Sequence, residues 1–266
     1  MAASHTKLLN LIATVLLAIT AITCILLGRW QLSRADERRE IAAVIERGRH
    51  AQSINLNHVA QEQMLQAWRP AEAQGIWKPE WSLLLDNRNL EGKPGLWLAT
   101  PLLLADGQAV LVLRGWFARP IGSQTSPKIQ TPPGLQRVTG EIALRVPRLF
   151  ELWGARENPQ SSLPEVWPAH GMTLNAADQS QETAELLRLQ NIDIAELSKR
   201  LKVGFLPVVL MQTDTLEDGL KRVWPEPSVD YDKNMGYAMQ WFGFAAIAVI
   251  AWLVFAWRMV RRKKAV

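Results

Sequence analysis

Two long apolar stretches constrain this chain more than any other feature. Leu8–Gly28 contains 21 consecutive residues without a charge, and Asn234–Trp257 contains 24. At about 1.5 Å of helical rise per residue, either stretch is long enough to cross a hydrocarbon core of about 30 Å. The sequence therefore predicts a membrane protein whose two transmembrane helices bracket everything else.

The charged residues predict how these helices are oriented. Residues 29–236 hold 24 Lys and Arg against all 25 Asp and Glu, whereas the last nine residues hold five positive charges and no acid. Basic residues that flank a span stay in the cytoplasm, so we expect both termini there and the middle segment outside. Four arginines just after the first stretch favour the opposite orientation, but the acid-free tail outweighs them. The tail charges are Arg258, Arg261, Arg262, Lys263 and Lys264.

The same patterns predict the boundaries of each part. The first stretch is longer than a signal-peptide core, and Thr23 before Cys24 fits a lipoprotein cleavage box poorly, so we expect an uncleaved anchor. Cys24 is the only cysteine, so an internal disulfide is excluded. The expected parts are a cytoplasmic N-terminus (1–7), a first span (8–28), an extracytoplasmic domain (29–236) that starts with a helical extension (29–49), a second span (237–257) and a basic cytoplasmic tail (258–266).

The middle segment has the pattern of an α+β domain. From about residue 67 to 146, short apolar runs alternate with turn residues, and Asp106-Gly107 between two such runs indicates a hairpin. We expect an antiparallel β-meander, curled into a small barrel or a sheet with one covered face. Further along, we expect a short strand at 171–175, a helix capped by Asp193 and a strand at 205–213.

The sequence contains no recognisable catalytic or metal-binding motif. Nucleophile-elbow, dinucleotide-binding, Walker, H-E-x-x-H and C-x-x-C patterns are all missing, and the four histidines have no metal-ligand spacing. The middle segment has one net negative charge, which excludes a broad nucleic-acid surface. We therefore expect a protein that is not an enzyme.

Two arginines stand beside tryptophans at the ends of apolar runs. Arg88 follows one run, and Arg114 with Trp116 ends another, while Trp97 lies between them. An arginine fork suits carboxylates, so these residues can meet an acidic partner or a ligand that carries propionates. The alternative is that each arginine pairs with a neighbouring acid and each tryptophan fills the core.

Four motifs occur together in order along nearly the whole chain. They are G-R-W-Q-L-S-R (28–34), L-D-N-R…G-K-P-G…T-P-L (85–102), V-L-V-L-R-G-W (110–116) and G-Y-A-M-Q-W-F (236–242). With the two-span layout, they resemble the Surfeit locus protein one family of cytochrome c oxidase assembly factors, in its bacterial form. The region 151–203 contributes least to this resemblance.

The resemblance implies an assembly chaperone of the respiratory chain in the bacterial inner (plasma) membrane, with a periplasmic domain. Family members help to mature subunit I of haem-copper oxidases, and bacterial members are thought to hold haem a and hand it over. A haem-synthesis enzyme is a further implied partner. The family commonly has a histidine three residues before the tyrosine of the last motif, but here that position is Asn234. An asparagine amide is a poor ligand for haem iron, whereas imidazole is a common one.

The start of the second span still has the side chains of a possible haem region. On a helix, Asn234, Tyr237 and Trp241 share a stripe with Gln240 at its flank, and such a stripe suits a flat apolar ring. Met235 and Met239 lie on a neighbouring face, and methionine ligates haem iron in cytochromes. The alternatives are an ordinary interfacial belt for Tyr237 and Trp241, and lipid or helix contacts for the methionines.

These observations together predict an assembly factor that helps haem a insertion into subunit I or stabilises that subunit. The candidate cofactor-binding residues are Asn234, Met235, Tyr237, Met239, Gln240 and Trp241, with Arg114 and Trp116 as a second surface. Three alternatives stay open: a scaffold that acts by contact without haem, a two-span periplasmic regulator of envelope polymer synthesis, and an unrecognised hydrolase.

Overall fold

The computed structural model describes residues 2–59, 62–119, 129, 131–147, 163 and 186–264. The chain divides into two units, of which the first joins Met1–Ala43 with Pro227–Val266 and the second is Val44–Glu226. The strand predicted at 171–175 lies outside the described residues.

The first unit contains most of the long helix α1 (Ala2–His50) and all of α3 (Tyr231–Lys264). Leu9–His50 and Tyr231–Met259 are both long and apolar enough to cross a membrane, with peak mean hydropathies of 2.6 and 1.9. Only 17% of either apolar window is buried, unlike the core helix of a soluble protein. The protein is therefore a membrane protein with two spans, and α1 continues without a break through the charged residues that follow its apolar stretch.

The two helices pack through small side chains. Between Ala21 and Ala35 of α1 the buried positions recur in steps of three, four and seven residues, and on α3 they recur in steps of seven and three. This spacing keeps one narrow face of each helix turned toward its neighbour, and small residues on that face let two backbones approach closely. The buried small residues are Ala21, Cys24, Gly28 and Ala35 on α1, and Ala238, Ala245 and Ala248 on α3.

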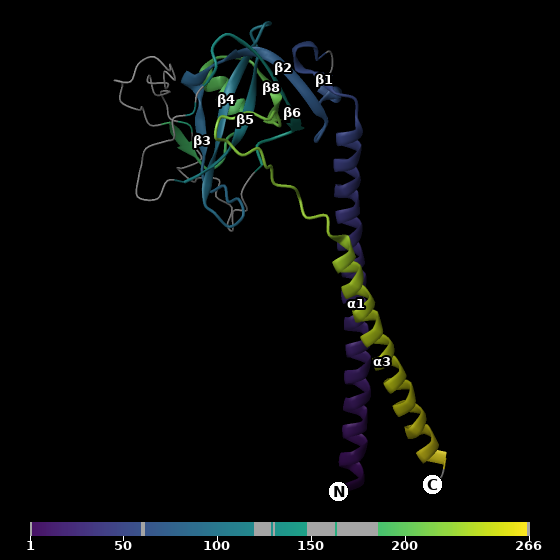
Figure 1. The fold of residues 1–266 in the computed structure, drawn as a ribbon. Coiled ribbons are helices and arrows are strands. Elements are labelled where there is room, and N and C mark those ends of the chain that lie inside the picture. The colour runs from purple at the N-terminus through teal and green to yellow at the C-terminus, as the bar shows by residue number, and fades with distance from the viewer. Residues whose placement is uncertain are drawn as a thin grey trace. The chain divides into compact units, whose positions relative to one another are not determined.

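The second unit is built on eight strands (Figure 1). They are β1 (Ile54–Asn55), β2 (Pro70–Trp77), β3 (Leu83–Leu85), β4 (Gly95–Leu104), β5 (Ala109–Ala118), β6 (Leu135–Ala143), β7 (Leu187–Leu189) and β8 (Phe205–Gln212). The strand order is β1-β2-β6-β8-β5-β4-β3-β7, and an additional pairing between β2 and β4 closes five of the strands into a small barrel. The α+β fold class with a small barrel is confirmed.

The strand pairing confirms the predicted hairpin and adds parallel contacts. β4 and β5 pair antiparallel across residues 105–108, where Gly107 has a φ of +84°. However, β8 inserts between β5 and β6 and runs parallel to β5, so the sheet is not a simple meander. The apolar pattern of residues 205–213 predicts a strand but does not say which neighbours it pairs with, because pairing depends on the whole barrel.

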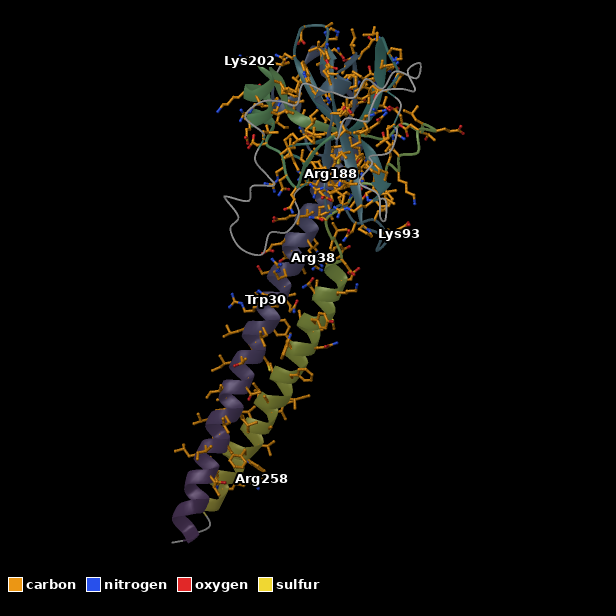
Figure 2. All side chains as sticks on the ribbon, turned by 90° about the vertical axis from the view of Figure 1, so that its left-hand side faces the viewer. Trp30, Arg38, Lys93, Arg188, Lys202 and Arg258 are labelled. Atoms are coloured by element: carbon orange, nitrogen blue, oxygen red, sulfur yellow. The ribbon has the colours of Figure 1, made fainter. Side chains whose placement is uncertain are left out.

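Two large clusters of buried side chains occupy the two sides of the barrel wall. The first draws on β2, β4, β5, β6 and β8, so it fills the barrel. The second covers the outer side of β3, β4, β5 and β8 and includes Leu197 of α2 (Ile194–Leu201). As predicted, Asp193 caps the start of α2, and its side chain accepts a hydrogen bond from the Ala195 amide. The helix ends at Lys202, which is labelled in Figure 2 and has a φ of +55°. Three short 3₁₀ helices, η1 (Leu56–His58), η2 (Glu62–Met64) and η3 (Pro79–Trp81), connect the strands.

Candidate functional site

Asn234 belongs to the seam between α1 and α3. Its side chain is half-buried, and its Nδ2 donates a hydrogen bond to Oε1 of Gln31 at 2.6 Å. One turn further along, Ala238 is fully buried, and Trp241 is half-buried. The position where the family commonly has histidine is therefore engaged in helix pairing.

The other predicted haem-region residues lie around the rest of α3. Tyr237 is 53% exposed and Met239 is 72% exposed, while Gln240 is also exposed and Met235 is half-buried. On an α-helix, Tyr237 is turned by about 60° from Asn234, whereas Trp241 is turned by only about 20°. The structure therefore separates the predicted stripe into Asn234 and Trp241 on the seam and Tyr237 beside it.

This stretch of α3 offers no imidazole for axial ligation of a haem. Among the described residues of α3 there is no histidine, and no group of three or more His, Cys, Asp or Glu in the described chain could hold a metal ion. The only sulfur donors on this stretch of α3 are Met235 and Met239, which lie four residues apart. The amide of Asn234 already donates to Gln31.

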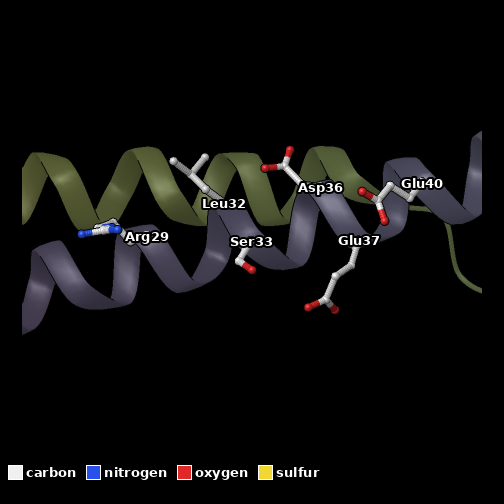
Figure 3. A pocket seen from close by; sticks show the side chains of 6 residues that line it. All are labelled: Arg29, Leu32, Ser33, Asp36, Glu37 and Glu40. Atoms are coloured by element: carbon white, nitrogen blue, oxygen red, sulfur yellow. The ribbon is translucent and has the colours of Figure 1, made fainter.

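A shallow depression on α1 gathers three carboxylates (Figure 3). Two of them are engaged in ion pairs on the same helix, Asp36 with Arg39 at 3.2 Å and Glu37 with Arg34 at 2.6 Å. The third, Glu40, lies at the end of the depression. Ion pairs between side chains three residues apart modestly stabilise an exposed helix. These carboxylates are therefore explained by the stability of α1, without a bound ligand.

Arg114 is buried and lies at a β-bulge. Leu98 and Ala99 of β4 pair with Gly115 and Leu113, so Arg114 has no partner residue on β4. Its guanidinium lies 5.1 Å from the Trp77 ring, and its Nη1 donates a hydrogen bond to Thr131. Trp77 belongs to the cluster inside the barrel, so Arg114 faces that side.

Arg114 shares one carboxylate with a second buried arginine. Asp218 accepts two hydrogen bonds from Arg222, and Nη2 of Arg114 lies 4.0 Å from the same carboxylate. Burial lowers the pKa of Arg114 to about 10; Asp218 opposes this shift and Arg222 adds to it. Asp218 thus holds two cations in the interior, a role that the sequence did not reveal.

Trp116 lies on the other side of the barrel wall. The bulge shifts the alternation of β5, so Trp116 joins the outer cluster of Leu111 and Leu113. Its ring nitrogen donates a hydrogen bond of 2.6 Å to the Arg88 carbonyl. Its backbone exchanges two hydrogen bonds of 2.7 Å with Lys221, which fixes residues 220–225 across the end of β5.

Arg88, Trp97 and Trp116 line one pocket, whereas Arg114 is not among its lining residues. The pocket has a volume of about 250 Å³ and is completed by Trp224, whose ring meets that of Trp97 edge-on at 5.3 Å. Trp224 was missed because residues 214–226 have neither strand nor helix periodicity. The pairing of Lys221 with Trp116 and a hydrogen bond of 2.9 Å from the Trp224 ring nitrogen to the Gln212 carbonyl bring Trp224 to the pocket.

These features define a membrane protein with two spans that carries a small β-barrel domain between them. The model of the SURF1 family matches residues 18–246, which include part of each span and the whole barrel. The chain belongs to the SURF1 family.

Related bacterial proteins are similar over most of their length. A SURF1-like protein of Rickettsia felis is 26% identical over 251 residues, covering 89% of this chain and 93% of that protein. SURF1-like proteins of Rickettsia bellii and Rickettsia prowazekii are 25% and 26% identical, covering 89% and 90% of this chain and 88% of each relative.

Proposed function

We propose that this protein is an assembly factor for a haem-copper (cytochrome c) oxidase and works on subunit I. The observation that carries the proposal is the family match, which runs from the first span through the barrel into the second span. The arrangement of the protein suits this task, since two membrane helices can meet a membrane-embedded subunit while a folded domain stays in water. We propose no reaction of its own.

In the proposed orientation, both termini are cytoplasmic and the barrel domain is periplasmic. Within the helix pair, the two chain ends lie at the same end (Figure 1). The basic residues that begin with Arg258 extend α3 at that end (Figure 2). Positive flanks favour the cytoplasm, so the bacterial inner membrane with a periplasmic domain is the topology that these charges support.

Of the two modes of action, stabilisation of subunit I by contact has the better support. Haem a hand-over, with a haem-synthesis enzyme as donor partner, needs a ligand at the start of α3. There, Asn234 donates its amide to Gln31, and Tyr237 and Met239 are exposed. Exposed aromatic and methionine side chains at a membrane boundary suit contact with another membrane helix.

Deletion of the gene is expected to lower oxidase activity and the haem a absorption of membranes severalfold, because subunit I then matures without its partner. Restoring the gene on a plasmid should return both. Oxidase activity and reduced-minus-oxidised spectra of membranes are the measurements. Unchanged oxidase levels, in a strain without a paralogue, would contradict the assembly function.

The absorption spectrum of the purified protein separates the two modes. From cells that make haem a, we expect the wild-type protein to show no Soret band, because no imidazole is present at position 234. Asn234→His restores an imidazole, and a Soret band in that variant alone would show that only the ligand is missing. A wild-type Soret band that disappears in a Met235→Leu, Met239→Leu double variant would instead support haem hand-over.

A further inference from the structure

The pocket lined by Arg88, Trp97, Trp116 and Trp224 contains a buried cation. Arg88 is only 4% exposed. Its Nη2 donates a hydrogen bond to the Gln190 carbonyl at 2.8 Å, and its guanidinium lies 4.7 Å from the centre of the Trp97 ring. Within the described chain, Nε has no hydrogen-bond acceptor, and the guanidinium forms no ion pair.

Asp86 does not neutralise this cation. Asp86 attracts Arg88 at a distance, but its carboxylate forms an ion pair with Arg119. Burial lowers the pKa of Arg88 to about 10, with Asp86 opposing the shift, so the side chain stays charged at neutral pH. A buried charge without a counterion is costly, and such a cost is typical of functional sites.

The turn at the edge of the pocket has a defined shape. Leu90 and Lys93 exchange two backbone hydrogen bonds around Glu91 and Gly92, which have φ values of +51° and +75° (Lys93 is labelled in Figure 2). Two positive φ values identify a type I′ turn, which fixes the hairpin between β3 and β4. Glu91 is exposed at the rim, and it is the acid among the described lining residues.

The size and lining of the pocket limit what it can bind. About 250 Å³ is below the usual range of roughly 300–1,000 Å³ for ligand sites, so the occupant is about as large as one side chain. Three indole rings favour an apolar or aromatic group, and the guanidinium fork favours a carboxylate.

We propose that this pocket binds a carboxylate joined to a small apolar or aromatic group. The carboxylate accepts hydrogen bonds from Arg88, and the apolar group packs against the indoles of Trp97 and Trp224. This site lies in the barrel domain, and its geometry and charge come from the second unit alone, so binding there does not depend on the assembly function.

Phenylacetate is the probe, and its uncharged analogue phenylacetamide is the comparison, both titrated by ligand-observed NMR into the full-length protein in detergent. We expect phenylacetate to bind the wild type and Arg88→Met to weaken binding about tenfold or more. Phenylacetamide should bind weakly to both proteins. Arg137→Met is the matched control, because Arg137 pairs with Glu72 on exposed strand surface away from the pocket.

Thermal unfolding shows whether Arg88 serves binding or folding. Because Arg88→Met removes a buried cation but keeps a long side chain, we expect its Tm to equal or exceed that of the wild type. If Arg88→Met lowers the Tm strongly, its weaker binding could come from unfolding, and Glu91→Gln then tests the binding proposal without removing a buried side chain. That surface change should tighten phenylacetate binding, because it removes a negative charge at the rim that repels the carboxylate of the ligand.

Two results would overturn the proposal: equal phenylacetate affinity in the wild type and Arg88→Met, or equal affinity in the wild type and Glu91→Gln. A competition experiment then asks where the carboxylate comes from. In it, a capped tetrapeptide that contains Asp-Phe competes with phenylacetate for the pocket. Tighter binding of the peptide assigns the pocket to an acidic protein segment, and tighter binding of the free acid assigns it to a small molecule.

Discussion

Replacing Gly28 with leucine is expected to separate the two membrane helices and to reduce oxidase activity to the level of the gene deletion. A Cβ at Gly28 would lie 2.7 Å from the Phe242 ring, closer than side-chain atoms approach in folded proteins. The seam on either side is formed by small buried residues such as Cys24 and Ala238, so a leucine fits at position 28 only if the partly exposed Phe242 ring turns away and the helices move apart. Overpacking at such a site costs about 1–3 kcal/mol for a few added atoms.

The matched control is Gly243→Leu on α3, where an added Cβ meets nothing within 4 Å. Both changes place the same side chain in an apolar helix, but only the first enters the seam. We expect the control to retain full complementation of the deletion. Normal oxidase levels with Gly28→Leu would show that the close approach of α1 and α3 is not needed for function.

Asp218→Asn is expected to destabilise the barrel domain by about 3–5 kcal/mol, because it leaves two buried guanidinium groups without their shared carboxylate. The Arg114 and Arg222 side chains are 3% and 7% exposed, so water cannot replace the lost charge. The loss should also loosen residues 220–225, which carry Trp224 to the pocket. Thermal or urea unfolding of the purified protein, followed by tryptophan fluorescence, measures both effects.

Adding Arg222→Met to Asp218→Asn should restore part of the stability, since one buried cation is then removed with its partner. Glu217→Gln, at an exposed neighbouring position, should leave the unfolding midpoint unchanged. If Asp218→Asn unfolds at the wild-type midpoint, the carboxylate of Asp218 does not stabilise the buried Arg114 and Arg222 side chains.

The pKa of Arg114 adds a pH dependence with a defined sign. Burial holds the pKa near 10, below the usual value of arginine, so above pH 10 the unfolded chain binds more protons than the folded one. The contribution of Arg114 to the free energy of unfolding therefore rises as the pH increases above about 10. At neutral pH, Arg114 is charged in both states, so the full cost of burying its charge lowers the stability of the fold. The carboxylate of Asp218 limits that cost.

The sequence alone determined the features that depend on neighbouring residues. Charge-free length predicted two spans, Asp106-Gly107 predicted the hairpin between β4 and β5, and Asp193 predicted the start of α2. Each is decided within one continuous stretch of chain, where apolar length, turn chemistry and capping act directly.

Only the tertiary structure decided which functional side chains meet. Arg114 and Trp116 are two residues apart, but a bulge in β5 places them on opposite sides of the barrel wall. Asn234 donates a hydrogen bond to Gln31 of α1, a partner that the sequence did not indicate. Strand register and helix pairing set these positions through contacts between distant segments, and one extra residue in a strand changes the face that every later side chain occupies.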